Sequence, residues 1–364
     1  TGAGEVSVSA IESVLGRSGE TDTVTLLDGS GTVRVSLVDE VIGTTATTDV
    51  IGMLSGGALS VSAVESVAGS ATTDTVTLLD NGGITVSGVE SVIGAAGGTD
   101  TLTLVGGATV RVSALEEIVG SGSTDVVHLL AAEDVSVSGI ETVVGAAGAE
   151  TVTFVASTAT TLAVSRVDSV VGTSNNADTI RLLGGQAVEV SAIETVLGST
   201  ASGDNVTLLG TDESVAVSLV DLVTGTTGTD DVVTMLSAGA LSVSIVDSVL
   251  GSGGTDTVTM IGQTDIRISS VETLVGTSGT TDTATLLSNS AVAVSAIESV
   301  IGDAGTADTL RLLGSGTIGV SISNIGTVLG SGGTDQVTML EDGDTIRVSQ
   351  VEVVHASTAG GDTV

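Results

Sequence analysis

Cysteine, proline and lysine are absent from this chain of 364 residues, and Phe154 is its single aromatic residue. Without cysteine there is no disulfide framework, no thiolate metal site and no cysteine nucleophile. Globular domains of ordinary composition carry aromatics, Lys and Pro, so a conventional globular core is not expected. The chain contains no run of about 18 apolar residues and no signal-peptide start, so membrane insertion is not expected.

Positive charge is also scarce. Lys and Arg together number 8 against 44 acidic residues, which gives a formal net charge of −36 at pH 7. Such a chain repels nucleic-acid phosphates and anionic lipid head groups, so the expected small partners are divalent cations and not nucleic acid. The apolar content of 41% argues against disorder, and the Gly residues lack the every-third-residue spacing of collagen.

One unit is repeated from end to end of the chain. Residues 251–260 show it most clearly, as a Gly-rich loop, one Asp and a short apolar strand. Self-similarity at a period of about 26 residues is typical of solenoids and other repeat architectures. The acid that follows the loop recurs at Asp22, Asp49, Asp74, Asp100, Asp125, Glu150, Asp178, Asp204, Asp231, Asp256, Asp282, Asp308, Asp335 and Asp362.

The pattern of apolar and polar residues predicts three short strands in each unit. Residues 6–14 alternate, shift phase near Ser9 and resume, which indicates strand, corner and strand, and residues 22–27 form a third strand. A unit of this length cannot bury its own apolar face, so stacked units are needed. We predict an all-β parallel β-solenoid of about 14 coils, each of about 26 residues and three strands, forming a single array over residues 1–364. The valines expected to point inward include Val8, Val35, Val112, Val190 and Val243.

Three other positions recur in every unit. A Gly follows the second strand, as at Gly94, and indicates either a backbone φ above zero or a tight corner. A Ser closes the first strand, as at Ser113, where its hydroxyl can hydrogen-bond along the axis or to the corner backbone. The apolar residue before the Gly, as at Ile93, is expected to face inward and not to form an outer apolar stripe.

Two acidic series hold most of the candidate chemistry. If each unit makes one coil, like acids stack about 4.8 Å apart and repel by about 0.9 kcal/mol in water, or about 3.5 kcal/mol at an effective dielectric of 20. Compensation then has to come from divalent cations, backbone donors, raised carboxyl pKa values or side chains that fan apart. The first series is the loop acid, and the second comprises Glu12, Asp39, Glu65, Glu90, Glu116, Glu141, Asp168, Glu194, Asp221, Asp247, Glu272, Glu298 and Glu352.

The loop at residues 251–259 resembles the nonapeptide G-G-x-G-x-D-x-U-x of RTX, or haemolysin-type, calcium-binding repeats, with Gly251, Gly254, Asp256 and Val258 in the matching places. The units also resemble the Val/Thr/Ser/Gly-rich arrays of large bacterial surface proteins such as adhesins, S-layer proteins and matrix proteins. The resemblance implies Ca²⁺ bound by loop Asp side chains and backbone carbonyls in a secreted protein. A loop Asp can also act only as a turn cap that accepts backbone N–H groups, and both interpretations stay open. The metal ligands implied by the resemblance are Asp22, Asp74, Asp100, Asp125, Asp256, Asp282 and Asp335.

The repeats favour a structural function over a catalytic one. His128 and His355 are far apart in the sequence, and no unit departs strongly from its neighbours, so we expect no enzyme. Paired Thr in the third strands, as at Thr101 and Thr103, resemble ice-binding solenoids, but residues such as Arg181 interrupt the array. We expect a stiff acidic filament, surface-layer or biofilm-matrix segment at the bacterial cell surface, with the spacer of an RTX-type adhesin as the alternative.

The two ends of the sequence lie inside a repeat and carry no recognisable cap. An uncapped solenoid exposes unpaired backbone groups and apolar core, which favours the addition of another chain. We therefore expect end-to-end self-association, or a longer chain of the same repeats.

Overall fold

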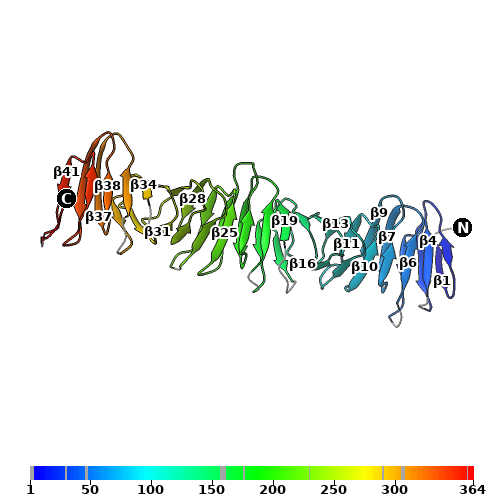
Figure 1. Cartoon of the computed structure of the whole chain (residues 1–364). Helices are drawn as coiled ribbons and strands as arrows, with labels where there is room; N and C mark the ends of the chain where they lie inside the picture. Colours follow the sequence, from blue (N-terminus) through cyan, green and yellow to red (C-terminus); the bar gives the residue numbers. More distant parts are fainter. Residues whose placement is uncertain are drawn as a thin grey trace. The chain divides into compact units, whose positions relative to one another are not determined.

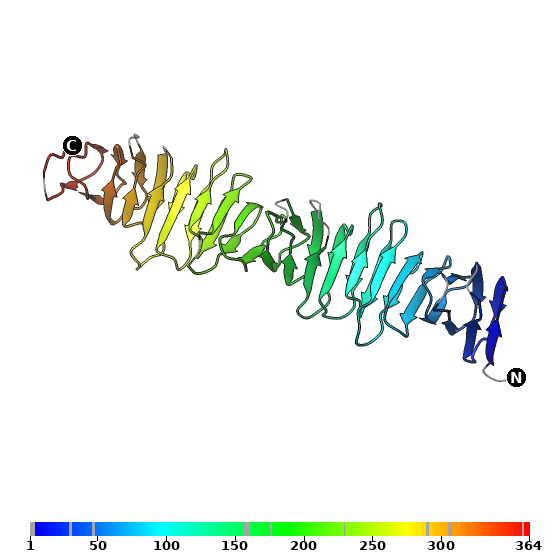
Figure 2. The same cartoon turned by 90° about the horizontal axis from the view of Figure 1, so that it is seen from below.

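The computed structural model describes residues 4–28, 31–45, 48–155, 161–174, 177–228, 230–288, 291–304, 308–358 and 360–364. The described residues contain strands, turns and bends but no helix, and therefore no helix able to cross a membrane. The chain divides into two compact units, residues 1–180 and 181–364. Each unit is a parallel β-solenoid, as predicted, and its successive turns stack side by side in Figure 1 and in the perpendicular view of Figure 2.

The predicted three strands per repeat are confirmed for every repeat except the last, in which the described residues form a first and a second strand only. The first strands, with the pattern apolar-x-apolar-Ser, are β1 (Gly4–Val8), β4 (Thr32–Ser36), β7 (Gly57–Ser62), β10 (Gly83–Ser87), β13 (Thr109–Ser113), β16 (Val135–Ser138), β19 (Thr161–Ser165), β22 (Ala187–Ser191), β25 (Ser214–Ser218), β28 (Ala240–Ser244), β31 (Asp265–Ser269), β34 (Ala291–Ser295), β37 (Thr317–Ser323) and β40 (Arg347–Ser349).

The second strands are three residues long and centred on one inward apolar residue. They are β2 (Ser13–Leu15), β5 (Glu40–Ile42), β8 (Ser66–Ala68), β11 (Ser91–Ile93), β14 (Glu117–Val119), β17 (Thr142–Val144), β20 (Ser169–Val171), β23 (Thr195–Leu197), β26 (Leu222–Thr224), β29 (Ser248–Leu250), β32 (Thr273–Val275), β35 (Ser299–Ile301), β38 (Thr327–Leu329) and β41 (Val353–His355).

The third strands follow the loop acid and alternate between outward polar and inward apolar residues. They are β3 (Asp22–Leu26), β6 (Val50–Met53), β9 (Asp74–Leu78), β12 (Thr101–Leu104), β15 (Val126–Leu129), β18 (Thr151–Phe154), β21 (Thr179–Leu182), β24 (Asn205–Leu208), β27 (Val232–Met235), β30 (Thr257–Met260), β33 (Thr283–Leu286), β36 (Thr309–Leu312) and β39 (Thr334–Met339).

The number of strands per turn differs from the prediction. In unit 1 the odd-numbered strands pair successively in one sheet, for example β9 with β11 and β11 with β13, and the even-numbered strands pair in the other. Unit 2 has the same arrangement, as β27 with β29 and β28 with β30 show. A turn therefore holds two strands, so a three-strand repeat makes one and a half turns. The chain forms about 19 turns and not about 14.

Strand register confirms the shorter turn. Ser91 lies opposite Thr75 on one side and Arg111 on the other, steps of 16 and 20 residues, and both are shorter than the sequence repeat of about 26. Each sheet consequently cycles through first, third and second strands, and identical positions return to the same sheet only after three turns.

The core lies between the two sheets. The valines predicted to point inward are buried, and the central residue of the second strands from β5 to β38, such as Val92, is completely buried. The outward slot between two inward valines holds exposed side chains such as Arg111. The core is a narrow double row of Val, Leu and Ile, which explains why a sequence with one aromatic residue can fill it.

The apolar residue before the recurring Gly faces outward, so its predicted inward orientation is wrong. Ile93 lies on the opposite side of β11 from the buried Val92 and is half-buried, and Leu15 is 75% exposed. Because second strands occupy every third place in a sheet, these residues are separated by other strands and form no continuous apolar stripe.

The paired threonines are dispersed in the same way. On one side, Thr103 of β12 lies opposite Thr85 of β10, and on the other it lies opposite Val119 of β14. No third strand is stacked directly on another third strand in the pairings of unit 1 or unit 2. The flat Thr array of an ice-binding face therefore does not form.

Candidate functional site

Three kinds of connection stack along each edge of a solenoid unit. We call them the corner, between first and second strands, the acidic loop, between second and third strands, and the return turn, between third strand and next first strand. Because a repeat makes one and a half turns, all three kinds follow one another on the same edge. In unit 1, for example, the return turn at 79–82, the acidic loop at 94–100 and the corner at 114–116 occupy consecutive turns.

The loop acid Asp100 connects these three turns through its backbone and side chain. Its Oδ2 accepts the Ala95 N–H of its own loop at 2.6 Å, and its Oδ1 accepts the Gly82 N–H of the return turn below at 2.8 Å. Its own N–H donates to Glu116 Oε2 in the corner above at 2.7 Å. Asp100 is completely buried, so backbone donors take the place of water around its carboxylate.

The same contacts recur at other loop acids. Asp125 accepts the Ala108 N–H at 2.9 Å and the Ser121 N–H at 2.6 Å, and it donates to Glu141 at 2.7 Å. Asp256 accepts the Ser252 N–H at 2.6 Å and donates to Glu272 at 2.7 Å. The completely or almost completely buried loop acids are Asp49, Asp74, Asp100, Asp125, Glu150, Asp178, Asp204, Asp231, Asp256, Asp282, Asp308 and Asp335.

The second acidic series supplies the contacts that loop acids make with the turn above them. These acids lie in corners, and most of them, from Asp39 to Glu352, accept the backbone N–H of a loop acid one turn below, as Glu298 does from Asp282 at 2.8 Å. The carbonyl of the loop acid in turn accepts a corner N–H, as in Glu298 N to Asp282 O at 3.1 Å. The two acidic series are therefore adjacent, and backbone donors separate their carboxylates.

Stacking of like acids at about 4.8 Å, as predicted for one coil per repeat, does not occur. Loop acids return to the same edge after three turns, or about 14 Å. Of the four forms of compensation considered, backbone donors are the form that the loop acids show. This geometry removes most of the repulsion that the two series would otherwise generate.

The recurring Gly is required by a close approach and not by a positive φ. A Cβ built on Gly94 would lie 1.7 Å from the carbonyl oxygen of Ala114 in the corner one turn above and 2.8 Å from Asp100 Oδ2. The left-handed residue is instead the corner residue after the Ser, such as Ala114 with φ 54° or Ile245 with φ 55°. A single left-handed residue makes the chain turn from one sheet to the other, and Gly88 and Gly139 fill the same position.

Two kinds of partner were predicted for the Ser that closes the first strand, and the contact along the axis is confirmed. Ser36 Oγ and Ser55 Oγ lie 3.0 Å apart in adjacent turns, and Ser9 Oγ donates to Asp28 at 2.7 Å. These hydroxyls bind along the axis, and nothing beside them activates a nucleophile.

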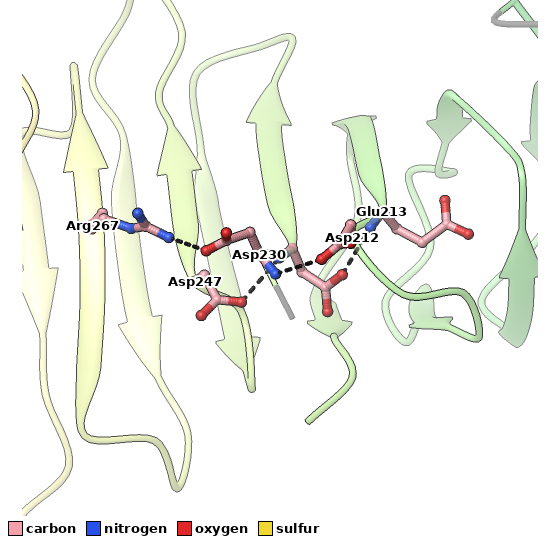
Figure 3. A network of polar contacts seen from close by, with 6 residues as sticks. Asp212, Glu213, Asp230, Asp247 and Arg267 are labelled. Carbon is pink, nitrogen blue, oxygen red and sulfur yellow. Dashed lines mark hydrogen bonds and ion pairs between the residues drawn. The ribbon is translucent and has the colours of Figure 1, made fainter. Parts of the chain in front are cut away.

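Sequence reasoning missed one dense acidic patch in unit 2 (Figure 3), because its acids come from neighbouring repeats. Asp230 N donates to Asp212 Oδ1 at 3.1 Å, and Arg267 forms an ion pair with Asp230 at 2.6 Å. Glu213 N donates to the carboxylate of Asp231, whose own N–H donates to Asp247. The sequence signal that could have indicated this patch is the pair of acidic doublets, Asp212-Glu213 and Asp230-Asp231.

Shallow notches lie over the corners, because the connections on either side project further. One in unit 2, of about 380 Å³, has Leu219 at its corner and is otherwise lined mainly by Ser, Ala and Gly. A similar notch of about 280 Å³ lies at Leu37 in unit 1. Both linings contain serines and acids, such as Asp221 in the first notch and Asp39 in the second, but neither contains a His, Lys or Cys.

The fit of Ca²⁺ to the loop acids can be tested on Asp100. Both of its oxygens face N–H donors, which a cation would have to displace. In unit 1, Asp22, Asp74 and Asp125 lie on one edge and Asp100 on the other, so they do not converge. Across the described residues, no group of three or more His, Cys, Asp or Glu is placed to hold a metal ion. The observed contacts suit the turn-cap function, and Ca²⁺ binding stays a prediction.

No family model matches the chain, and no curated protein or solved structure does either. The fold and the contacts between turns define the class of protein: a β-solenoid repeat protein.

Proposed function

We propose that the chain is a structural segment of an extracellular bacterial surface protein, in which stacked turns provide stiffness and dense negative charge provides hydration. The single observation that supports this proposal most directly is the loop acid that joins three consecutive turns, as Asp100 joins the turns of Gly82 and Glu116. A residue type repeated in this role serves cohesion between turns.

The proposed location rests on the resemblance to RTX segments and bacterial surface arrays. A surface layer, a biofilm matrix and a filament all need a stable scaffold. Its copies must repel one another until cations screen their negative charge. The net charge of −36 fits that requirement, because self-repulsion keeps an acidic chain soluble and divalent cations reduce it. Ca²⁺ is the proposed cation, acting at exposed carboxylates such as Asp212 and Asp230.

Self-association tests this function. Purified chain at micromolar concentration would be followed by analytical ultracentrifugation and electron microscopy, in buffer with EDTA and in buffer with millimolar Ca²⁺ or Mg²⁺. We expect ordered assemblies that Ca²⁺ promotes and EDTA reverses. A chain that stays monomeric under all these conditions would contradict assembly through these repeats alone, and would favour a passive spacer beside an adhesive domain.

Mechanical measurement separates a cohesive scaffold from a loosely stacked array. The chain would be pulled between two handles in an optical trap. We expect release in steps of about one to three turns at forces that fall when Asp100 and Asp125 are both changed to Ala. Extension without resolvable steps would contradict a scaffold function.

A further inference from the structure

Glu150 is the one loop acid in the series that is not Asp, and its carboxylate is not satisfied. The residue is 1% exposed, and neither Oε1 nor Oε2 forms a hydrogen bond. Asp100, at the equivalent position on the same edge, has both oxygens bonded to backbone N–H groups. A buried carboxylate without donors is costly in its charged form, because neither water nor a dipole replaces its hydration.

The extra methylene group of Glu accounts for the lost contacts. The Glu150 carboxylate still reaches the recurring Gly, since a Cβ on Gly145 would lie 3.2 Å from Glu150 Oε2. The return turn below is rearranged, however. Thr151 N donates to the Asp134 side chain at 3.1 Å, whereas the equivalent Thr101 N donates to the Gly82 carbonyl at 3.0 Å.

A second unsatisfied carboxylate lies one turn below. Glu133 belongs to that return turn; its Oε2 accepts the Ala114 N–H at 2.5 Å, but its Oε1 is buried and has no partner. One turn above, Asp168 Oδ2 accepts the Glu150 N–H at 3.3 Å. The charged groups that act on Glu150 are Asp168 and Arg166 from above, and Asp134 holds the neighbouring Thr151 N–H from below. The Glu133 carboxylate points to the turn of Ala114 and Glu116.

We propose that Glu150 is a proton-binding site, with Glu133 in the next turn as a second and separate one, so that the folded chain holds protons that the unfolded chain releases. Two adjacent turns hold three buried carboxylate oxygens without donors, and Asp168 adds a further negative charge beside Glu150. A bound positive charge would therefore stabilise these carboxylates. A proton supplies that charge without a coordination shell. A metal ion needs one, and the described residues offer no cluster of three suitable ligands.

The electrostatic surroundings act in the same direction. Burial, followed by the nearby Asp168 carboxylate, raises the pKa of Glu150 above its ordinary value. The Ala146 backbone N–H lies close enough to offset this in part, as does Arg166, but forms no hydrogen bond with either Glu150 oxygen. Burial also raises the pKa of Glu133, assisted by the charge of Glu116 and opposed by the Ala114 N–H. Protonation of Glu150 removes its repulsion with Asp168 and leaves a neutral carboxyl group that can donate a hydrogen bond.

The sign of the pH effect follows from these directions. When the folded pKa exceeds the unfolded one, the folded state binds more protons between the two values, and stability falls as pH rises through that window. The turns around Glu150 are thus most stable at mildly acidic pH and weaken toward neutral pH. A capped loop acid such as Asp100 has no unsatisfied oxygen, because both oxygens accept backbone N–H groups.

Hydrogen exchange read by mass spectrometry tests the site in the intact chain. After correction for intrinsic rates, protection of peptides covering 133–155 and 161–171 is expected to rise as pH is lowered from about 8 to about 5, by about tenfold for each unit between the folded and unfolded pKa values. Peptides from unit 2 around Asp256 serve as the internal control. An equal response in both units, or no response at 133–171, would overturn the proposal.

Three variants separate protonation from poor packing. Glu150→Asp restores the capped geometry, so protection at neutral pH is expected to rise and the local pH response to shrink. Glu150→Gln imitates the neutral acid and is expected to be as protected at pH 8 as the original chain is at pH 5. Asp100→Glu should create the pH response in a new place. If Glu150→Gln stays as weak at pH 8 as the unchanged chain, the extra length alone is responsible and the proposal fails.

Titration with a cation provides the last distinction. At pH 8, Ca²⁺ or Mg²⁺ is expected to leave the difference in protection between the unchanged chain and Glu150→Gln intact. Millimolar Ca²⁺ that abolishes this difference would show a metal site instead of a proton site. The test does not depend on assembly, so its failure would leave the proposed structural function standing.

Discussion

Asp100 and Glu116 lie in adjacent turns, and the Asp100 backbone N–H donates to Glu116 Oε2 at 2.7 Å. Their separation of 16 residues is much shorter than the sequence repeat of about 26. The two acids that recur in every repeat thus come together from different repeats, and each contributes to holding the turn of the other.

Removing the Asp100 side chain is expected to destabilise unit 1. Asp100→Ala removes the acceptor of the Gly82 and Ala95 N–H groups, both in part-buried bonds, at a cost of up to about 1–3 kcal/mol for each. The measurement is chemical denaturation followed by circular dichroism. Glu20→Gln, at an exposed residue, is the control and should change stability by less than about 0.5 kcal/mol. Equal effects of both substitutions would contradict the cap function.

A side chain at the recurring Gly should be far more damaging than one at a loop Gly nearby. Gly94→Ala places Cβ 1.7 Å from the Ala114 carbonyl oxygen, so adjacent turns have to separate, and the loss should exceed the about 1–3 kcal/mol typical of overpacking. Gly122→Ala meets nothing within 4 Å and has no left-handed φ, so it should be close to neutral. Thermal melting of the two variants compares them directly.

The corner offers a stabilising substitution. Ala114 adopts φ 54°, a conformation that costs an L-residue about 1–2 kcal/mol and costs Gly almost nothing. Ala114→Gly should therefore raise stability by up to about 1 kcal/mol after the larger entropy loss of Gly, whereas Ala114→Val should lower it. Calorimetry of both variants tests this. If Ala114→Gly were less stable than the original chain, the left-handed conformation assigned to the corner residue would be wrong.

The ion pair between Arg267 and Asp230 should contribute little. Their side chains are 44% and 78% exposed, and exposed pairs are worth about 0–1 kcal/mol. Arg267→Ala is expected to shift the denaturation midpoint only slightly. Added salt should instead stabilise the chain, because screening weakens the repulsion of a net charge of −36. A loss of stability in salt would show that attractive pairs dominate.

Local pattern was enough to predict the strands, the parallel stacking and the inward residues such as Val92. It was not enough to predict how far around the axis one repeat travels. Three strands in about 26 residues fit either one three-sided turn or one and a half two-sided turns, and both bury the same valines. The difference lies in the corner, where a single left-handed residue such as Ala114 sends the chain to the opposite sheet.

The residues of the candidate site could be predicted from the sequence, but the contacts between them could not. The acids were recognised as two series, yet the partner of Asp100 could be found only once the turn length was known. The Gly was interpreted as either a φ requirement or a tight corner, and its close approach to a neighbouring turn was missed because that neighbour, Ala114, belongs to the following repeat. Glu150 was noted as a departure from the pattern, but its unsatisfied oxygens depend on the geometry of two adjacent turns.

Disulfide trapping would decide the turn length directly, since the chain has no native cysteine. Thr85 and Thr103 lie opposite one another on adjacent parallel strands, a spacing of about 5 Å between Cα atoms that a disulfide can span. Thr77 and Thr103 occupy equivalent positions in successive repeats but lie in opposite sheets, since Thr77 pairs with Ile93 of β11. The double variant Thr85→Cys with Thr103→Cys is expected to crosslink under mild oxidation, and Thr77→Cys with Thr103→Cys is expected to remain reduced. Mass spectrometry of the digested protein reads the outcome, and efficient crosslinking of the second pair would restore one turn per repeat and remove the basis for the contacts of Asp100.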